Sequence, residues 1–302
     1  MHTNLEFSSL LGNRSVSKSI DVLFVATEVE PFVKTGSLAD LAGNMPKNVK
    51  SMGHEIRVML PGYGSINERR YHLHNLLRMQ GIEIPIGNTC ELAYVKSSYI
   101  NCDNKKVQVY FLSNERYFNR QGLYFHPETK EHFIDNDERF IFFARGVLET
   151  LKRLGWQPRI IHCNDWQCGL IPAYLKTLYK DDPFFKNTRT VFTAYSLASH
   201  GTFSRTSYLK TGLPPAVLLG NDIDSGKLDF LKAGLTYADV ITTIGMKADK
   251  RLFSSSKNGI EEMLHSHNKH VVSLTPTSQN GDRYAQLAEK FVSIYRDLAK
   301  NG

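Results

Sequence analysis

Short apolar runs alternate with segments of helical spacing along most of the chain. The runs are rich in β-branched and aromatic residues and too short for helices, so they predict buried strands at Val22–Ala26, Glu55–Leu60, Arg159–His162, Thr190–Ala194 and Ala238–Thr243. Apolar residues at helical spacing predict helices at Leu38–Met52, Phe140–Leu151, Gly169–Tyr179 and Phe230–Leu235. This alternation predicts an α/β fold with a single doubly wound, mainly parallel sheet and helices on both faces.

Some parts of the chain depart from this alternation. Residues 66–113 alternate short strands with turns and predict a β-rich insert that completes the sheet, with strands at Ile82–Ile86, Glu91–Ser98 and Val107–Leu112. Polar residues 254–282 predict a linker, and apolar positions spaced by three and four predict an amphipathic helix over residues 283–302. With a polar leader at residues 1–19, we expect one domain at residues 20–253.

Composition narrows the classes of function. The 302 residues are 41% hydrophobic and 22% charged, as in a globular protein, and no apolar run reaches the length of a membrane span. The net charge of +7 suits anionic partners such as nucleotides, whereas the lack of a dense Lys/Arg run with interleaved aromatics argues against nucleic acid. No secretion signal is visible, so we expect a cytoplasmic protein.

The four cysteines show no zinc-type CxxC pairing: Cys90, Cys102, Cys163 and Cys168. We expect reduced thiols with structural roles and no metal site. A metal or redox pair formed by Cys163 and Cys168 is the minor alternative.

The stretch Asp21–Asp40 carries the clearest chemistry. A strand is followed by a turn that ends in Lys34-Thr35-Gly36-Ser37, and then by a helix. In α/β folds this order builds an anion site, because the amides and the dipole at a helix N-terminus favour negative charge. Lys34 adds a full positive charge at the same place. The sequence therefore predicts a phosphate-binding site at Lys34, Gly36 and Ser37.

The heptapeptide KTGSLAD at Lys34–Asp40 resembles the KTGGLAD signature of bacterial glycogen synthases and plant starch synthases. The resemblance implies the N-terminal, Rossmann-like half of a GT-B enzyme that transfers glucose from ADP-glucose, or UDP-glucose, to an α-1,4-glucan. It also implies that Lys34 and the glycine-rich turn hold the donor diphosphate. Ser37 stands at the second glycine of the signature and places a side chain where backbone would approach the sugar nucleotide.

Two further polar segments follow predicted strands. The family reads HxHDWH at residues 162–167, and His162, Asp165 and Trp166 keep its pattern, so the resemblance places them at the sugar pocket. Tyr124, in a polar and aromatic loop, is expected to line the same pocket. For Asp165 an N-cap of the following helix stays open, and for Tyr124 a solvated loop.

Tyr195 occupies the position of the histidine that lies closest to the reacting glucosyl centre in the family. The resemblance therefore assigns catalytic positions to Tyr195 and Asp165. An imidazole can be a cation near physiological pH, whereas a phenol is uncharged below pH ~10. Tyr195 is also bulkier than histidine and is able to fill the donor pocket.

The resemblance covers residues 20–245, the first half of the family enzyme. Residues 246–302 show no counterpart of the second GT-B domain, which supplies cations for the diphosphate, and the C-terminal helix resembles the one that returns to the first domain. We therefore expect a protein that is inactive alone or needs a partner. The alternatives are a glucan- or sugar-nucleotide-binding protein, a regulatory partner of a full-length synthase, and one half of a split glycosyltransferase whose protein partner covers the open face.

Overall fold

The computed structural model describes residues 19–195, 201–215, 217, 227–244, 271–274 and 282–300. Residues 1–18 of the predicted leader and most of the predicted linker lie outside these residues. The central strands are β1 (Asp21–Val25), β2 (Glu55–Pro61), β6 (Ile160–Asn164), β7 (Arg189–Ala194) and β10 (Val240–Ile244). The insert contributes β3 (His74–Ile86), β4 (Thr89–Cys102) and β5 (Lys105–Ser113), and β11 (Val271–Leu274) lies at the opposite edge.

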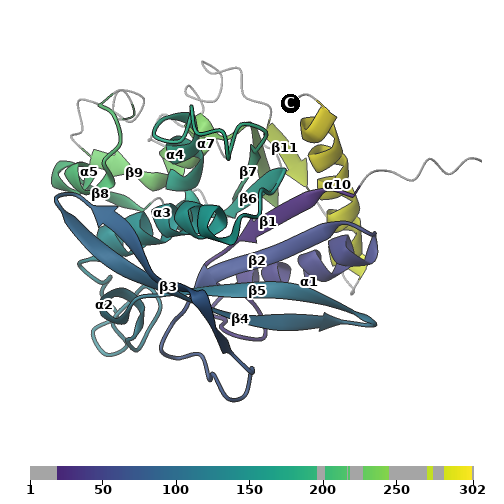
Figure 1. Ribbon diagram of the computed structural model, residues 1–302, viewed down its shortest axis with the longest axis horizontal. Coiled ribbons are helices and arrows are strands. Elements are labelled where there is room, and N and C mark those ends of the chain that lie inside the picture. The colour runs from purple at the N-terminus through teal and green to yellow at the C-terminus, as the bar shows by residue number, and fades with distance from the viewer. Residues whose placement is uncertain are drawn as a thin grey trace, which may run out of the picture.

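These strands form one nine-stranded sheet in the order β11-β10-β7-β6-β1-β2-β5-β4-β3 (Figure 1). Neighbouring strands from β11 to β5 are parallel, whereas β4 is antiparallel to both β5 and β3. The predicted α/β fold with a mainly parallel sheet is therefore confirmed, and the insert extends the same sheet. A separate pair, β8 (Thr202–Ser204) and β9 (Lys227–Asp229), is antiparallel.

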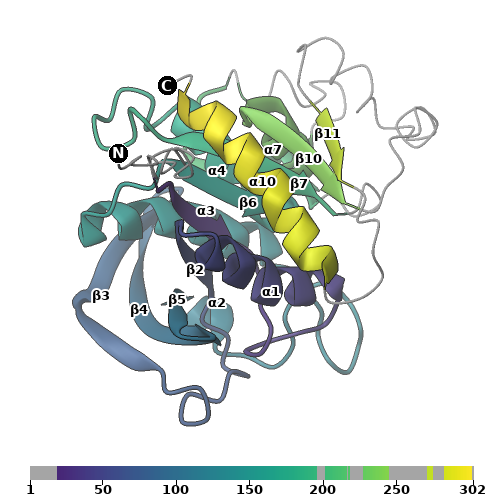
Figure 2. The ribbon, with the colours of Figure 1, turned by 90° about the vertical axis from the view of Figure 1, so that its right-hand side faces the viewer.

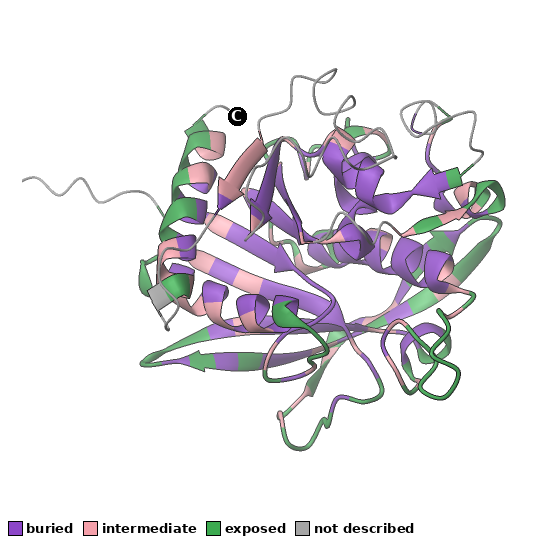
Figure 3. Cartoon of the chain, turned by 180° about the vertical axis from the view of Figure 1, so that it is seen from behind, coloured by how far each residue is buried: buried purple, intermediate pink, exposed green. Residues whose placement is uncertain are grey.

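Helices cover both faces of the sheet. One face carries α1 (Ser37–Ser51) and α10 (Asp282–Lys300), and the other carries α3 (Asn136–Leu154), α4 (Leu170–Lys176) and α7 (Phe230–Tyr237) (Figures 1 and 2). Short helices α2 (Glu115–Phe118) and α5 (Arg205–Thr211) and a 3-10 turn at Trp166–Cys168 lie in the connections. Buried residues fill the central strands, and exposed residues are concentrated on the outer strands, loops and helix backs (Figure 3).

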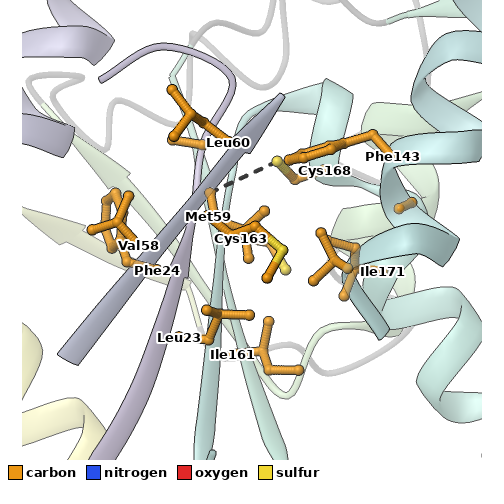
Figure 4. Packing of buried hydrophobic residues seen from close by; sticks show 14 of the residues in the cluster. Leu23, Phe24, Val58, Met59, Leu60, Phe143, Ile161, Cys163, Cys168 and Ile171 are labelled. Carbon is orange, nitrogen blue, oxygen red and sulfur yellow. Dashed lines mark hydrogen bonds between the residues drawn. The ribbon is translucent and has the colours of Figure 1, made fainter. Parts of the chain in front are cut away.

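The alternation of side chains along each strand decides which helix a residue meets. Ile161 and Cys163 of β6 point toward Phe143 of α3 and Ile171 of α4 (Figure 4). The intervening residue, His162, points to the opposite face and contacts α10. The core is therefore divided by the sheet into two packed layers.

The predicted amphipathic helix is confirmed as α10, which runs beside α1 across the sheet (Figure 2). Its apolar stripe is buried: Leu287, Ala288, Phe291, Val292 and Tyr295. Other expectations need correction. Part of the predicted linker is strand β11, and the helix predicted at Gly169–Tyr179 is the shorter α4.

Candidate functional site

A pocket of about 340 Å³ opens where β1, β6 and β7 end. The carboxyl ends of parallel strands are where α/β folds bind ligands. The predicted site residues that line it are Gly36, Ser37, Tyr124, Asp165, Trp166 and Tyr195. Its other lining residues are Glu28, Leu38, Phe125, His132 and Gln167. We call it the strand-end pocket; Lys34 and His162 are not in its lining.

Glu28 fixes the turn between β1 and α1. Its buried carboxylate accepts hydrogen bonds from the amides of Thr35 and Gly36, at 2.5 and 3.0 Å, and from the Thr35 hydroxyl at 2.7 Å. The Tyr124 hydroxyl also donates to this carboxylate, at 3.0 Å, and lies 2.7 Å from the Thr27 hydroxyl. Part of the anion site predicted from the sequence is therefore occupied by a carboxylate of the chain itself.

The N-terminus of α1 keeps donors for an external anion. The backbone amides of Ser37 and Leu38, residues in the pocket lining, have no hydrogen-bond acceptor in the described part of the chain. The ammonium of Lys34 pairs with Asp40 at 2.6 Å, and this hydrogen bond raises the pKa of Lys34. Because the pair is exposed, water and salt screen it.

Asp165 has the most unusual conformation in the site. It directly follows β6 with φ 62° and ψ 174°, a region that is nearly restricted to glycine. Its Oδ1 atom is inaccessible to solvent and has no hydrogen-bond partner. Burial raises the pKa of Asp165 to about 7, and the charge of Glu28 acts in the same direction. A strained carboxyl with a buried free oxygen is a strong candidate for ligand contact.

The side chain of Asp165 makes no cap hydrogen bond to the 3-10 turn that follows it. The helix that follows this turn, α4, has Gly169 at its N-cap, so the N-cap alternative considered from the sequence is wrong. The amides of Trp166 and Tyr195 do face the carboxyl and lower its pKa, but burial outweighs them. The carboxyl thus faces backbone amides on one side, and Asp165 is part of the pocket lining.

Aromatic rings form the walls of the pocket. Trp166 is only 4% exposed, since its indole packs on Phe140 at 5.1 Å between centroids, so it shapes the pocket more than it offers a stacking surface. Gly201 lies against the same indole with φ 60°, and a Cβ there would fall 2.0 Å from the ring. Tyr195 is partly buried, and this burial raises the pKa of its phenol, which therefore stays neutral.

His162 belongs to the core and not to the pocket. It is fully buried, with Nδ1 2.6 Å from the Tyr295 hydroxyl and Nε2 2.6 Å from the Thr193 hydroxyl. Thr193 lies 2.6 Å from Thr242 in turn, so a chain of hydrogen bonds crosses from α10 through β6 and β7 to β10. Burial lowers the pKa of His162 to about 3, so the imidazole is neutral at physiological pH.

Reasoning from the sequence missed several residues of the pocket. Phe125 and His132 form a β-bridge, with ring centroids 4.3 Å apart, and close the loop beside Tyr124. Gln167 is buried, and its Oε1 atom has no hydrogen-bond partner. The sequence offered a signal for two of them, because Phe125 and Gln167 directly follow the predicted site residues Tyr124 and Trp166, whereas His132 lies further along the loop.

Within the described ranges, no group of three or more His, Cys, Asp or Glu side chains could hold a metal ion. Cys163 and Cys168 are buried, and this burial raises the pKa of both thiols. The Cys168 thiol donates to the carbonyl of Val25 at 3.7 Å, which is a structural contact. In the same ranges, none of the helices combines the length and the apolar character that crossing a membrane requires.

Comparison with known proteins places this chain in a family. Residues 21–266 match the family model described as starch synthase catalytic domain. The glycogen synthase of Chlorobaculum parvum is 38% identical over 249 residues, which are 82% of this chain and 50% of that protein. The glycogen synthase of Chlorobium phaeobacteroides is 39% identical over 226 residues, 75% of this chain and 46% of that protein.

The fold agrees with this match. The catalytic domain of starch synthase IV from Arabidopsis thaliana, solved with ADP and acarbose bound, superimposes with a TM-score of 0.73 at 21% identity. The matched region is 87% of this chain and 54% of that chain. The chain thus spans about half the length of these relatives. Because the family model covers most of the sequence, this protein belongs to the starch synthase catalytic domain family.

Proposed function

We propose that the chain binds a glucose unit, of a glucan or of a nucleotide sugar such as ADP-glucose or UDP-glucose, in the strand-end pocket, and that it does not transfer glucose on its own. The observation that carries the proposal is a pair of buried, unpartnered acceptors in the lining, Asp165 Oδ1 and Gln167 Oε1. Sugar hydroxyls are donors that satisfy such atoms. The family membership and the ADP and acarbose bound to starch synthase IV support this choice of ligand.

The size of the pocket favours a single sugar unit. Its volume of about 340 Å³ lies near the lower end of the ~300–1,000 Å³ typical of small-molecule sites. The free amides of Ser37 and Leu38 lie at the rim where a phosphate of a nucleotide sugar would continue out of the pocket. Lys34 is near enough in sequence to join them once it leaves Asp40.

The charges in the site argue against efficient transfer by this chain alone. Glucosyl transfer requires stabilisation of a leaving diphosphate and of positive charge on the sugar, and such electrostatic stabilisation is usually the largest catalytic contribution. The described lining residues include no Lys or Arg, and the Glu28 carboxylate takes the amides of Thr35 and Gly36. The neutral phenol of Tyr195 cannot supply the missing positive charge.

The test has a binding part and a transfer part. Calorimetric titration with maltotriose and with ADP-glucose is expected to show binding that Asp165→Asn weakens by about tenfold, as for loss of a hydrogen bond to a charged group. Asp182→Asn is the matched control, since Asp182 pairs with Lys152 away from the pocket. Equal affinity for Asp165→Asn and the native chain would contradict the assigned pocket.

Transfer is measured as incorporation of labelled glucose from ADP-glucose, and in parallel UDP-glucose, into glycogen. We expect no incorporation by the native chain. Incorporation by the native chain would overturn the non-catalytic part of the proposal. Activity appearing only in Tyr195→His would show that Tyr195 alone prevents transfer. Inactivity of both chains would indicate that transfer needs cations that the described lining residues do not supply.

A second candidate is one half of a split glycosyltransferase or a regulatory partner of a full-length synthase. It is favoured by the observation that the described lining residues of the strand-end pocket include no Lys or Arg, which a partner would then have to supply. Mixing the purified chain with a glycogen synthase of the family and measuring both co-elution and transfer rate tests it. Independent elution with an unchanged rate would argue against this candidate.

A further inference from the structure

A second pocket, of about 650 Å³, lies on the other side of the turn that joins β1 to α1. Glu30, Pro31 and Phe32 of this turn contribute to its lining, whereas Glu28 and Gly36 of the same turn line the strand-end pocket. The remaining walls come from α1, from the segment before β3, and from β4 and β5. We call this cavity the basic pocket.

Cationic side chains dominate the basic pocket. Lys47, Arg70 and Lys106 line it, and none of the three forms an ion pair in the ranges the structure describes. Two imidazoles add further donors, while Glu30 is the one carboxylate among the lining residues that the structure describes. Lys47 donates to Asn44 Oδ1 at 3.1 Å, which leaves its charge unpaired. Three cations without a carboxylate partner around a cavity with a single lining carboxylate favour an anionic ligand.

Aromatic rings hold the cations at the edge of the cavity. The Arg70 guanidinium lies 5.2 Å from the centre of the Tyr71 ring, and the Lys106 ammonium 5.4 Å from the centre of the Tyr99 ring. Such contacts orient a cation without neutralising its charge. The Tyr99 ring is 48% exposed and offers a flat surface beside these charges for an organic group.

The wall shared with the turn is firmly built. The Tyr71 hydroxyl donates to the carbonyl of Pro31 at 2.5 Å, and the Tyr71 carbonyl accepts from the Ser98 hydroxyl at 2.5 Å. The Tyr71 ring also packs edge-on against Phe32, with centroids 5.1 Å apart. The cavity is therefore bounded by fixed side chains and not only by mobile surface lysines.

We propose that the basic pocket binds a small phosphate-bearing organic molecule, at a site separate from the strand-end pocket. Phosphate oxygens match the guanidinium and ammonium donors, and the volume lies within the range of small-molecule sites, ~300–1,000 Å³. The inference does not depend on the proposed sugar-binding function, because it concerns different residues and is tested by binding alone. Since the turn Glu28–Gly36 borders both cavities, the site is placed to influence the strand-end pocket.

The test is calorimetric titration of the full chain with glucose 6-phosphate, inorganic pyrophosphate and glucose. Both phosphates are expected to bind, more weakly as ionic strength rises, and the double variant Arg70→Gln/Lys106→Gln is expected to lose at least about tenfold in affinity. The matched control Lys180→Gln/Lys186→Gln removes the same charge from exposed positions outside the pocket and is expected to bind normally. Thermal unfolding of both variants checks that they fold.

The outcomes separate this site from its alternatives. Tighter binding of glucose 6-phosphate than of pyrophosphate would support contact with the organic group and agrees with the proposal. Tighter binding of pyrophosphate would indicate recognition of phosphate alone and would overturn the organic part of the proposal. Equal affinity of the native chain and the Arg70→Gln/Lys106→Gln variant would overturn it. So would equal losses in the control variant, binding of glucose as tight as that of glucose 6-phosphate, or binding abolished by Asp165→Asn instead.

Discussion

Replacing Asp165 with asparagine tests the buried carboxyl, because the two side chains have the same shape and differ in charge. Burial raises the pKa of Asp165 from its ordinary 3.8 to about 7. Below about pH 4 the carboxyl carries its proton in both the folded and the unfolded chain, so its pKa shift does not change the free energy of unfolding. Between about pH 4 and 7 the unfolded chain releases its proton and the folded chain does not, so stability falls as pH rises.

The size of this effect follows from the shift. At 1.36 kcal/mol per pKa unit, a shift of about three units destabilises the folded chain by about 4 kcal/mol above pH 7. Asp165→Asn removes this cost, so its free energy of unfolding should exceed the native value by up to about 4 kcal/mol at pH 8 and by almost nothing near pH 4. A role in ligand binding would explain why the chain has a residue that lowers its stability in this way.

Urea unfolding of the native chain and the variant across this pH range measures the difference. Asp182→Asn serves as control, since its hydrogen bond with Lys152 lowers the pKa of Asp182. That carboxyl is ionised in both states above about pH 5, so the control should differ from the native chain by a constant amount there. Parallel stability curves for Asp165→Asn and the native chain would refute the raised pKa.

Five further substitutions probe the surroundings of the site. Gly201→Ala should cost about 2–3 kcal/mol in urea unfolding, because the added Cβ meets the indole ring, whereas Gly36→Ala, with open space around it, should be nearly neutral. Glu28→Gln should cost about 2 kcal/mol and speed hydrogen exchange of the amides that the carboxylate holds, and unchanged exchange would contradict that anchor. Tyr295→Phe should cost about 1–2 kcal/mol by chemical unfolding through loss of the hydrogen bond to the buried imidazole, and a neutral result would rule it out. In the native chain burial lowers the pKa of His162 to about 3, so the free energy of unfolding falls as pH drops below about 6.5. His162→Gln should reduce this fall at acid pH. An unchanged fall would show that another group causes it.

The order of strands and helices could be predicted because it depends on local periodicity. Each central strand is a short apolar run, and α10 shows the three-and-four spacing of a helix buried on one side. Strand β11 was missed because its four residues lie inside a polar stretch. They are identified as a strand only by their pairing with β10. Strands β3 and β4 are longer than predicted, since apolar character does not follow burial along their added residues: Leu77 of β3 and Tyr99 of β4 are exposed.

The candidate site could be predicted only in part, for a related reason. Asp165 and Tyr195 are the first residues after β6 and β7, so the position of the strands was enough to bring them together. The role of Glu28 could not be foreseen, because its partners are amides that lie seven and eight residues later and approach it only after the turn closes. The basic pocket was missed entirely, since its cations come from separate elements.

His162 shows most clearly why a motif does not fix a position in space. The resemblance placed it with Asp165, and both residues do belong to the end of one strand. Along β6, however, side chains alternate between faces, and His162 lies on the face covered by α10. There its Nδ1 atom forms a hydrogen bond with the Tyr295 hydroxyl. Asp165 lies beyond the last paired residue, where the strand has ended and its positive φ turns the chain toward the pocket. The imidazole of His162 therefore connects the C-terminal helix to the sheet, whereas Asp165, three residues later, lines the pocket. The two residues have different roles because His162 lies within the strand, where side chains alternate between faces, and Asp165 lies after its end.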